Sequence, residues 1–267
     1  MDAITMMTPL CLDDHSKEHP WLVGGRAAQR SRRITGRHSH ARGQILGVIS
    51  GVMAVRTDRE YLLVGPDQVL WLPPRVVHTA HSHGAVSTWS LYVEEKCAQP
   101  LPSGPVIFKA TSLLKELAVR IVRDTNERNW TTTLSRIADT FWEEFLSLPS
   151  LALSLPRPLS PGLIRVTATL EEDPADSRMQ EEWASLAGMS VRTFVRHFAS
   201  ETGLNFSVWR QRLRMVHAQE QLARGLGVTS VALNVGYESM GAFASTFRRF
   251  TGHSPSEYAR LCQAHKD

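Results

Sequence analysis

Residues 190–203, SVRTFVRHFASETG, and residues 239–252, SMGAFASTFRRFTG, are two copies of one pattern. Each copy begins with a Ser, which can cap a helix by accepting a hydrogen bond from an unpaired backbone N–H. Each carries two Phe four residues apart, so that both rings lie on one helix face. Each ends in the Gly that suits the position after a helix. The pattern predicts two similar helices, 49 residues apart in the sequence.

A short helix-like run with a glycine turn comes before each copy, WASLAG at residues 183–188 and VALNVG at residues 231–236. Two helices joined by a short turn that contains Gly form a helix-turn-helix. The sequence therefore predicts two such motifs, at about 178–200 and at about 229–250.

The distribution of charge supports a nucleic-acid partner for this region. The whole chain has a net charge of only +4, which says little by itself. Residues 185–260, however, hold nine Arg and no Lys against four Glu. Phosphate binding requires positive charge that is concentrated locally in this way. We therefore expect the C-terminal part of the chain to bind double-stranded DNA.

Residues 161–261 resemble the AraC/XylS family of bacterial transcription regulators. The resemblance rests on four stretches together: WASLAGMS, F-x3-F-x3-TG, VTSVALNVGYES and AFASTFRRFTGHSPSEYAR. Within the family, the chain looks most like the nitroimidazole-resistance type of repressor. The resemblance implies that both recognition helices enter successive major-groove segments on one face of the duplex. It also implies that the long helix between the two motifs holds them apart.

The outward faces of the two expected recognition helices differ. Opposite its Phe pair, the first helix presents polar side chains that can reach base edges: Arg192, Thr193, Arg196 and His197. The second presents small or short ones instead, with Ser239, Met240 and Ser245 nearest the bases. Arg248 and Arg249, near its C-terminal end, are better placed for phosphates. We therefore expect the first helix to supply most base discrimination and the second mainly to position the protein.

The N-terminal part of the chain has a different pattern. The first 36 residues, with an Arg-rich patch, are expected to be irregular. Short β-like runs separated by turn signals then follow as far as about residue 95, which indicates a barrel or sandwich. Residues 112–124 and 133–148 return to helical spacing. Two amphipathic helices there either close the base of the barrel or pair with a second subunit.

The predicted fold class is therefore α+β and multidomain, with an N-terminal cupin-like β-barrel and a C-terminal all-α domain that contains two helix-turn-helix motifs. Residues 1–105 are expected to form the sensor domain with its N-terminal arm, and residues 106–148 a helical connector that is a candidate for dimerisation. Residues 149–160, rich in Pro and Ser, are expected to be a linker. Residues 161–267 complete the chain as the DNA-binding domain.

A candidate metal site lies in the expected barrel. Residues 38–51 have the spacing H-x-H-x3-Q-x6-G, and His78 follows downstream. This resembles the two motifs of the cupin barrel, whose metal-binding members use two His and a Glu from the first motif and a His from the second. The resemblance implies His38, His40, Gln44 and His78 as the ligands. Imidazole suits Zn, Ni, Fe or Cu, and two His at i and i+2 on a strand share a face.

The departure at Gln44 leaves two alternatives open. A neutral amide is a poorer ligand than a carboxylate and does not offset the charge of a cation. The barrel therefore either holds one divalent transition metal, or is a metal-free pocket that binds a small molecule or merely holds packed histidines. Trp71 and Trp89 fall on strand-like runs. They either line this effector pocket or pack in the core.

The ends and the cysteines of the chain set further expectations. The first residues, MDAITMMTPL, lack a basic segment followed by a long apolar run. No window approaches roughly 18 consecutive apolar residues. Cys11, Cys97 and Cys262 are far apart, as in proteins of a reducing compartment. We therefore expect a cytoplasmic protein with no signal peptide and no membrane partner.

The main interpretation is a one-component transcription regulator rather than an enzyme, whose barrel senses a small molecule or a metal. Its expected partners are double-stranded DNA, an unidentified small-molecule effector, RNA polymerase and a second copy of the chain. A metal-dependent cupin enzyme fused to a DNA-binding domain is the alternative, disfavoured by the missing carboxylate and by the lack of a nucleophile or general-base pattern. A DNA-binding accessory protein with an inert barrel is a third interpretation. Repression and activation both stay open.

Overall fold

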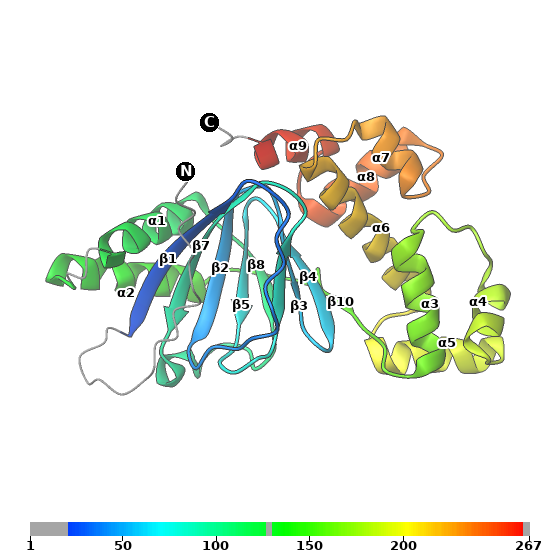
Figure 1. The fold of residues 1–267 in the computed structure, drawn as a ribbon, viewed down its shortest axis with the longest axis horizontal. Helices are drawn as coiled ribbons and strands as arrows, with labels where there is room; N and C mark the ends of the chain where they lie inside the picture. Colours follow the sequence, from blue (N-terminus) through cyan, green and yellow to red (C-terminus); the bar gives the residue numbers. More distant parts are fainter. Residues whose placement is uncertain (1–20, 127–129, 264–267) are drawn as a thin grey trace.

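The computed structural model describes residues 21–126 and 130–263. Most of the expected N-terminal arm, with Cys11, and the last four residues lie outside the described residues. A strand-rich N-terminal half and a helical C-terminal half lie side by side (Figure 1). The strands are β1 (Leu22–Gln29), β2 (Gly43–Ser50), β3 (Met53–Arg56), β4 (Glu60–Val64), β5 (Gln68–Leu72), β6 (Thr79–Ser82), β7 (Val86–Val93), β8 (Val106–Lys109), β9 (Ser150–Leu151) and β10 (Leu155–Pro156). The helices are η1 (Glu95–Ala98), α1 (Ser112–Asn126), α2 (Thr132–Leu146), α3 (Pro161–Glu172), α4 (Gln180–Ala187), α5 (Val191–Thr202), α6 (Phe206–Ala223), α7 (Val228–Asn234), α8 (Met240–Thr251) and α9 (Pro255–Gln263).

The N-terminal half contains two sheets that face each other. One has the strand order β1-β7-β2-β5-β8-β9 and the other β10-β4-β3-β6. Alternate residues of both sheets point between them and form a buried apolar layer, which includes Leu46, Val55, Leu62 and Leu70. The predicted β-barrel is thus a two-sheet, cupin-like structure, and the α+β prediction for the whole chain is confirmed.

Helices α1 and α2 cover the outer face of the larger sheet (Figure 1). Their apolar faces bury Leu114, Ile121 and Phe141 against side chains of that sheet. The ring of Phe141 meets the ring of Trp89 edge-on, with centroids 6.4 Å apart. These helices therefore complete the core of the sensor domain on the outer face of the larger sheet, rather than closing the base of a barrel. Their pairing with a second subunit stays a prediction.

The prediction that the first 36 residues are irregular is wrong for residues 22–29. They form β1, which pairs along its whole length with β7. Two adjacent glycines disguise this strand in the sequence because Gly is a poor strand former. Gly24 is needed for close packing, since a Cβ there would lie 2.8 Å from the Cα of Val122 on α1.

The expected linker, residues 149–160, lies on the sheets rather than crossing open solvent. Strand β9 pairs with β8, and β10 pairs with β4. Leu155 is fully buried. The backbone carbonyl of Pro156 accepts a hydrogen bond of 2.7 Å from the indole N–H of Trp209 on α6. The segment therefore fastens the helical domain to the smaller sheet.

The helical domain contains the two expected helix-turn-helix motifs, α4 with α5 and α7 with α8. Ser190, Asn205 and Ser239 cap the helices that follow them, each side chain accepting a backbone N–H of its helix. Gly188 and Gly236 both have a left-handed backbone, at φ 72° and 79°, which other residues adopt only with strain. Each glycine makes the turn of its motif.

Sheet and helices share one continuous apolar core at the boundary between the two halves. The outer face of the smaller sheet contributes Val52, Tyr61 and Leu63 to the same cluster as the side chains of α6 and α9. The backbone N–H of Gly51 donates to the carbonyl of Cys262 at 2.8 Å across this boundary. The smaller sheet is therefore buried on both faces.

Among the described residues, no helix is both long and apolar enough to cross a membrane.

Candidate DNA-binding surface and sensor pocket

Helix α5 buries its Phe pair and exposes its polar face. Phe194 and Phe198 are completely buried against α6. Of the four side chains predicted to read DNA, Arg192, Arg196 and His197 are exposed. Thr193 is half-buried, and its hydroxyl accepts a hydrogen bond from the Ser190 hydroxyl at 3.0 Å. Thr193 therefore belongs to the cap of the helix, which leaves three side chains projecting from this face.

Helix α8 has the same buried pair, Phe243 and Phe247, but a different outer face. The Ser239 hydroxyl accepts the backbone N–H of Ala242 at 3.3 Å, so this side chain is engaged as a cap. Met240 and Ser245 are exposed, as are Arg248 and Arg249 in the last turn. The first half of the helix therefore offers bases one thioether and one hydroxyl, and its charge lies at the far end.

Part of the positive charge counted in the sequence holds the domain together. Three arginines of α6 are half-buried and donate to backbone carbonyls: Arg210 to Asp176 and Arg178, Arg212 to Ser154, and Arg214 to Pro174 and Gly236. Guanidinium groups used in this way are not available to phosphates. The local excess of Arg therefore overstates the charge that can face DNA.

The structure brings His38, His40 and His78 together at one end of the sheets. One ligand atom from each ring lies within 4.8 Å of the other two. The backbones of His38 and His78 form a bridge, with hydrogen bonds of 3.0 and 2.9 Å in the two directions. The backbone hydrogen bonds, and not contacts between the rings, therefore hold His38 and His78 opposite each other.

The ring orientation in this cluster suits metal binding. Nδ1 of His38 lies 2.8 Å from the carbonyl of Gly36, and Nδ1 of His78 lies 2.9 Å from the carbonyl of Val76. A carbonyl can only accept, so each Nδ1 carries the proton and each Nε2 keeps a lone pair. Burial, together with repulsion from His78 and His38, lowers the pKa of His40 to about 4. Burial also lowers the pKa of His78. His40 and His78 are therefore neutral at pH 7, the form that binds metals.

Gln44 lies on the inner face of the larger sheet, on the same side of β2 as Leu46. Its side-chain N–H donates to the Ser90 hydroxyl at 2.9 Å, whereas its side-chain oxygen is buried without a hydrogen-bond partner. An orphaned buried acceptor is costly, and a cation or a donor group of a ligand would satisfy it. Three imidazoles and one amide oxygen fit a divalent transition metal as a donor set.

The expectation that Trp71 and Trp89 line an effector pocket is wrong. Both side chains are 1% exposed and belong to the core between the larger sheet and α1 and α2. They project from the outer face of that sheet, opposite the face of Gln44. Each ring fills the space above a glycine of β2, since a Cβ on Gly43 or Gly47 would lie within 2.2 Å of a ring atom. Core packing, the second alternative for these residues, is what the structure shows.

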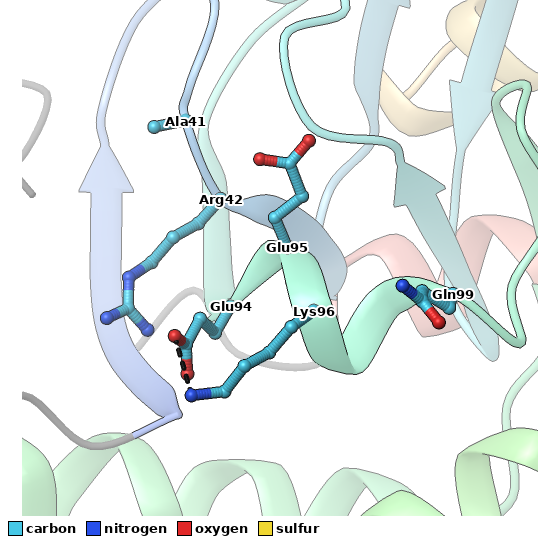
Figure 2. A pocket seen from close by; sticks show the side chains of 6 residues that line it. All are labelled: Ala41, Arg42, Glu94, Glu95, Lys96 and Gln99. Atoms are coloured by element: carbon cyan, nitrogen blue, oxygen red, sulfur yellow. Dashed lines mark ion pairs between the residues drawn. The ribbon is translucent and has the colours of Figure 1, made fainter.

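A polar hollow of about 530 Å³ lies between the residues just before β2 and the short helix η1 (Figure 2). It is lined by Ala41, Arg42, Glu94, Glu95, Lys96 and Gln99. Lys96 and Glu94 form an ion pair of 3.0 Å, drawn as a dashed line in Figure 2. Two cationic and two anionic side chains balance each other there. The hollow therefore has no net charge that would select an ionic ligand.

Sequence reasoning missed a buried group of ionisable side chains at the boundary between the two halves. Glu220 of α6 contacts Tyr61 of β4 and His83, which follows β6. A signal was present in the sequence. Trp209, Leu213 and Val216 mark the buried stripe of α6, and residue 220 continues that spacing. A Glu in a buried stripe indicates a partner from elsewhere in the fold.

A ligand-binding sheet domain joined to a domain with two helix-turn-helix motifs defines the class of one-component transcription regulators. Residues 21–186 match the family model of the AraC-like ligand binding domain, and residues 183–261 match that of a helix-turn-helix domain. The first match spans more than half of the chain. The chain belongs to the AraC/XylS family of transcription regulators.

Several known proteins are similar to the chain over most of its length. The HTH-type transcriptional regulator NimR of Escherichia coli is 27% identical over 225 residues, which are 84% of this chain and 82% of NimR. The arabinose operon regulatory protein of Salmonella typhimurium is 23% identical over 83% of this chain and 85% of its own length. The crystal structure of ToxT from Vibrio cholerae O395 matches with a TM-score of 0.39 and 10% identity, over 90% of this chain and 97% of that one. The family models and the two regulators confirm the predicted family and its function in transcription.

Proposed function

We propose that α5 supplies most of the base recognition of this regulator and that α8 mainly positions it on the duplex. The observation that carries this proposal is the contrast between the exposed faces of the two helices. Arg192 and Arg196 lie one turn apart on α5, and Arg pairs well with the O6 and N7 edge of guanine. Arg248 and Arg249 at the end of α8 are suited to phosphate contacts, which hold any sequence alike.

Binding-site selection from a pool of random duplexes tests this assignment. The wild-type chain is expected to select a site with a strongly preferred half and a weakly preferred half. The triple variant Arg192→Ala, Arg196→Ala, His197→Ala should lose the strong half. The matched variant Met240→Ala, Ser245→Ala should keep it. Loss of the strong half in the α8 variant alone would contradict the assignment.

We further propose that the sensor site is the cluster of His38, His40 and His78 with Gln44, and that it holds one divalent transition metal. The neutral Nε2 donors and the orphaned oxygen of Gln44 support it. The metal would supply a Lewis-acid centre that either is the signal itself or helps to hold an organic effector. Either ligand regulates DNA binding only if it binds one arrangement of the protein better than another.

Metal content of protein purified without a His-tag or chelator tests the sensor site. We expect close to one metal per chain, lost in the variant His38→Ala, His78→Ala. The variant His81→Ala, His83→Ala removes two imidazoles nearby and should keep the metal. Metal-free wild-type protein would turn the site into a pocket for an organic ligand alone, which can be screened by its effect on DNA affinity.

Three further expectations remain part of this proposal. A second copy of the chain is a proposed partner because cyclic dimers are the commonest assemblies, and Leu113 and Leu146 on α1 and α2 are exposed. RNA polymerase is a proposed partner because a transcription regulator acts on its access to promoters. The proposed location is the cytoplasm, since the protein must meet the DNA that it regulates.

A further inference from the structure

Four ionisable side chains form one network where β4 and β6 meet α6. His83 Nε2 lies 3.2 Å from Glu220 Oε1, and the hydroxyl of Tyr61 donates to the same carboxylate oxygen. The Tyr61 hydroxyl oxygen also lies 3.4 Å from His81 Nε2 and 3.3 Å from His83 Nε2. Two domains therefore share a single hydrogen-bonded group.

The network is buried, and its charges are only partly balanced. Tyr61 is 8% exposed and Glu220 is 9% exposed. Burying a carboxylate is costly unless it is paired. The other charged and titratable groups that face the network come from the elements packed around it: Arg56 on β3, Glu171 on α3, His217 on α6, Arg224 at the end of α6, Tyr258 on α9, and Arg32 after β1. Arg56 is itself paired with Glu171, at 3.7 Å.

Burial shifts both kinds of group toward their neutral forms. It raises the pKa of Glu220 to about 7, and it lowers the pKa of His83 to about 4. The pKa of His81 is lowered for the same reason. When the domains separate and water enters, these groups return toward ordinary values. Closing the contact therefore takes up a proton at Glu220 near neutral pH and releases protons from the imidazoles in mild acid.

The raised pKa of Glu220 and the lowered pKa values of the imidazoles affect the contact in different pH ranges. A carboxyl group with a raised pKa stabilises the contact at low pH, and this stabilisation is lost as the pH rises through about 7. Imidazoles with lowered pKa values favour the contact above their ordinary value of 6.5 and weaken it as the pH falls below that value. The contact is therefore weakened in acid by the imidazoles, and it loses the contribution of Glu220 above about pH 7.

We propose that Tyr61, Glu220, His81 and His83 form a proton-operated latch between the sensor domain and the DNA-binding domain. With Glu220 protonated and the imidazoles neutral, the smaller sheet stays on α6. Ionisation of Glu220, or protonation of the imidazoles, releases α6, the helix that joins the two helix-turn-helix motifs. The latch uses none of the side chains proposed to hold the metal.

The structure offers a direct reporter of this contact and a reference for the released state. The N–H of Gly51 donates to the Cys262 carbonyl across the same boundary, so its hydrogen exchange measures how often the contact opens. A Cβ on Gly65 would lie 2.2 Å from the Tyr258 hydroxyl oxygen. The variant Gly65→Val therefore wedges the two domains apart without touching the latch.

The test is the exchange of the Gly51 amide in the full chain, followed by NMR and corrected for the intrinsic pH dependence of exchange. Glu220→Gln mimics the neutral carboxyl group and keeps the imidazoles, so the ratio of wild-type to Glu220→Gln protection isolates the contribution of Glu220. A Glu with a pKa of about 7 when closed and 4.5 when open makes this ratio about fourfold smaller at pH 8.5 than at pH 6.5. Glu172→Gln, a matched change at an exposed position at the end of α3, should keep the wild-type pH dependence.

A second variant keeps the test open if Glu220→Gln fails to fold. The Tyr61 hydroxyl lowers the pKa of Glu220 by its hydrogen bond, so Tyr61→Phe should move the alkaline midpoint to higher pH. The latch is overturned if the ratio of wild-type to Glu220→Gln protection does not change between pH 6.5 and 8.5, or if Tyr61→Phe leaves the alkaline midpoint in place. Wild-type protection equal to that of Gly65→Val at pH 6.5 would overturn it as well.

Discussion

The two helix-turn-helix motifs share one sequence pattern but are anchored to different parts of the molecule. In the first motif, Phe198 packs edge-on against Phe206 and Trp209 at the start of α6, with centroids 5.2 and 5.6 Å apart. In the second, Phe247 packs edge-on against Tyr258 of α9 at 5.4 Å. Tyr258 in turn reaches the sensor domain beside Gly65, whereas Trp209 reaches it at Pro156 of β10. The two motifs are therefore connected to different parts of the sensor domain.

The exposed faces of α5 and α8 differ as well. The first exposes Arg192, Arg196 and His197 along one helix face. The second exposes Gly241 and Ala242 at the corresponding end. Two copies of a motif can thus keep the same buried side chains while their surfaces and anchors diverge. This contrast in the exposed faces is the basis for the proposed difference between α5 and α8 in DNA binding.

The largest expected effect comes from substitutions that disrupt the packing of each motif. Phe198→Ala and Phe247→Ala should each cost about 3–5 kcal/mol of unfolding free energy, because both rings are completely buried. Urea denaturation followed by circular dichroism measures this cost. Hydrogen exchange of the Gly51 amide, which donates to Cys262 of α9, distinguishes the two variants. It should accelerate much more in Phe247→Ala than in Phe198→Ala, because Phe247 packs against α9. Equal acceleration in both variants would contradict the difference in anchoring.

A smaller effect is expected from Arg196→Ala, which removes a side chain proposed to contact a base. Its affinity for the selected duplex should fall by about 1–3 kcal/mol, and the preference at one base position should relax. Fluorescence anisotropy with a set of single-base variants of the duplex measures both. Arg260→Ala on α9 removes an exposed arginine outside both motifs and is the control. Unchanged preference in Arg196→Ala would remove α5 as the main reader.

The helix caps should respond equally in the two motifs. Ser190 and Ser239 each accept a backbone N–H at 3.3 Å, so Ser190→Ala and Ser239→Ala should each cost about 1 kcal/mol. Urea midpoints measure the cost. A clearly larger loss in one variant would show that its serine has a second role, and the hydrogen bond from Ser190 to Thr193 makes the first motif the place to look.

The smallest expected effect concerns Arg249→Ala. Loss of one phosphate contact should weaken all duplexes alike, by less than about 1 kcal/mol at moderate salt, and reduce the slope of log K against log salt by about one. A salt titration on the selected duplex and on an unrelated one measures this. A loss confined to the selected duplex would make Arg249 a base-reading residue and would weaken the contrast between the motifs.

Local sequence signals were sufficient for the helical domain. Ser190 and Ser239 were recognisable as caps, because capping depends on residues within one turn. The start of α4 is less clear from the sequence. The nearby Asp176 pairs with Arg178, and Met179 precedes the helix, with its backbone N–H donating to the carboxylate of Glu182. Several nearby polar residues competed for one role.

Long-range packing was beyond the same signals. The face on which Trp71 and Trp89 lie depends on strand register, and a shift of one residue reverses it. His81 on β6 and His83 just after it contact Tyr61 and Glu220, which are themselves 159 residues apart in the sequence, so no local signal connects the four residues. The cluster of His38, His40 and His78, by contrast, was implied by the resemblance of two short local motifs to those of the cupin barrel.

The segment that joins the two halves has a practical consequence for dissecting the protein. Trp209 and Arg212 of α6 donate to the carbonyls of Pro156 and Ser154, which precede the first helix of the DNA-binding domain. A fragment cut at residue 161 would lose both acceptors, and the carboxylate of Glu201 would lose the backbone N–H groups of Leu159 and Ser160. A DNA-binding fragment that keeps these contacts must therefore start before residue 154, and it then carries β10 of the smaller sheet with it.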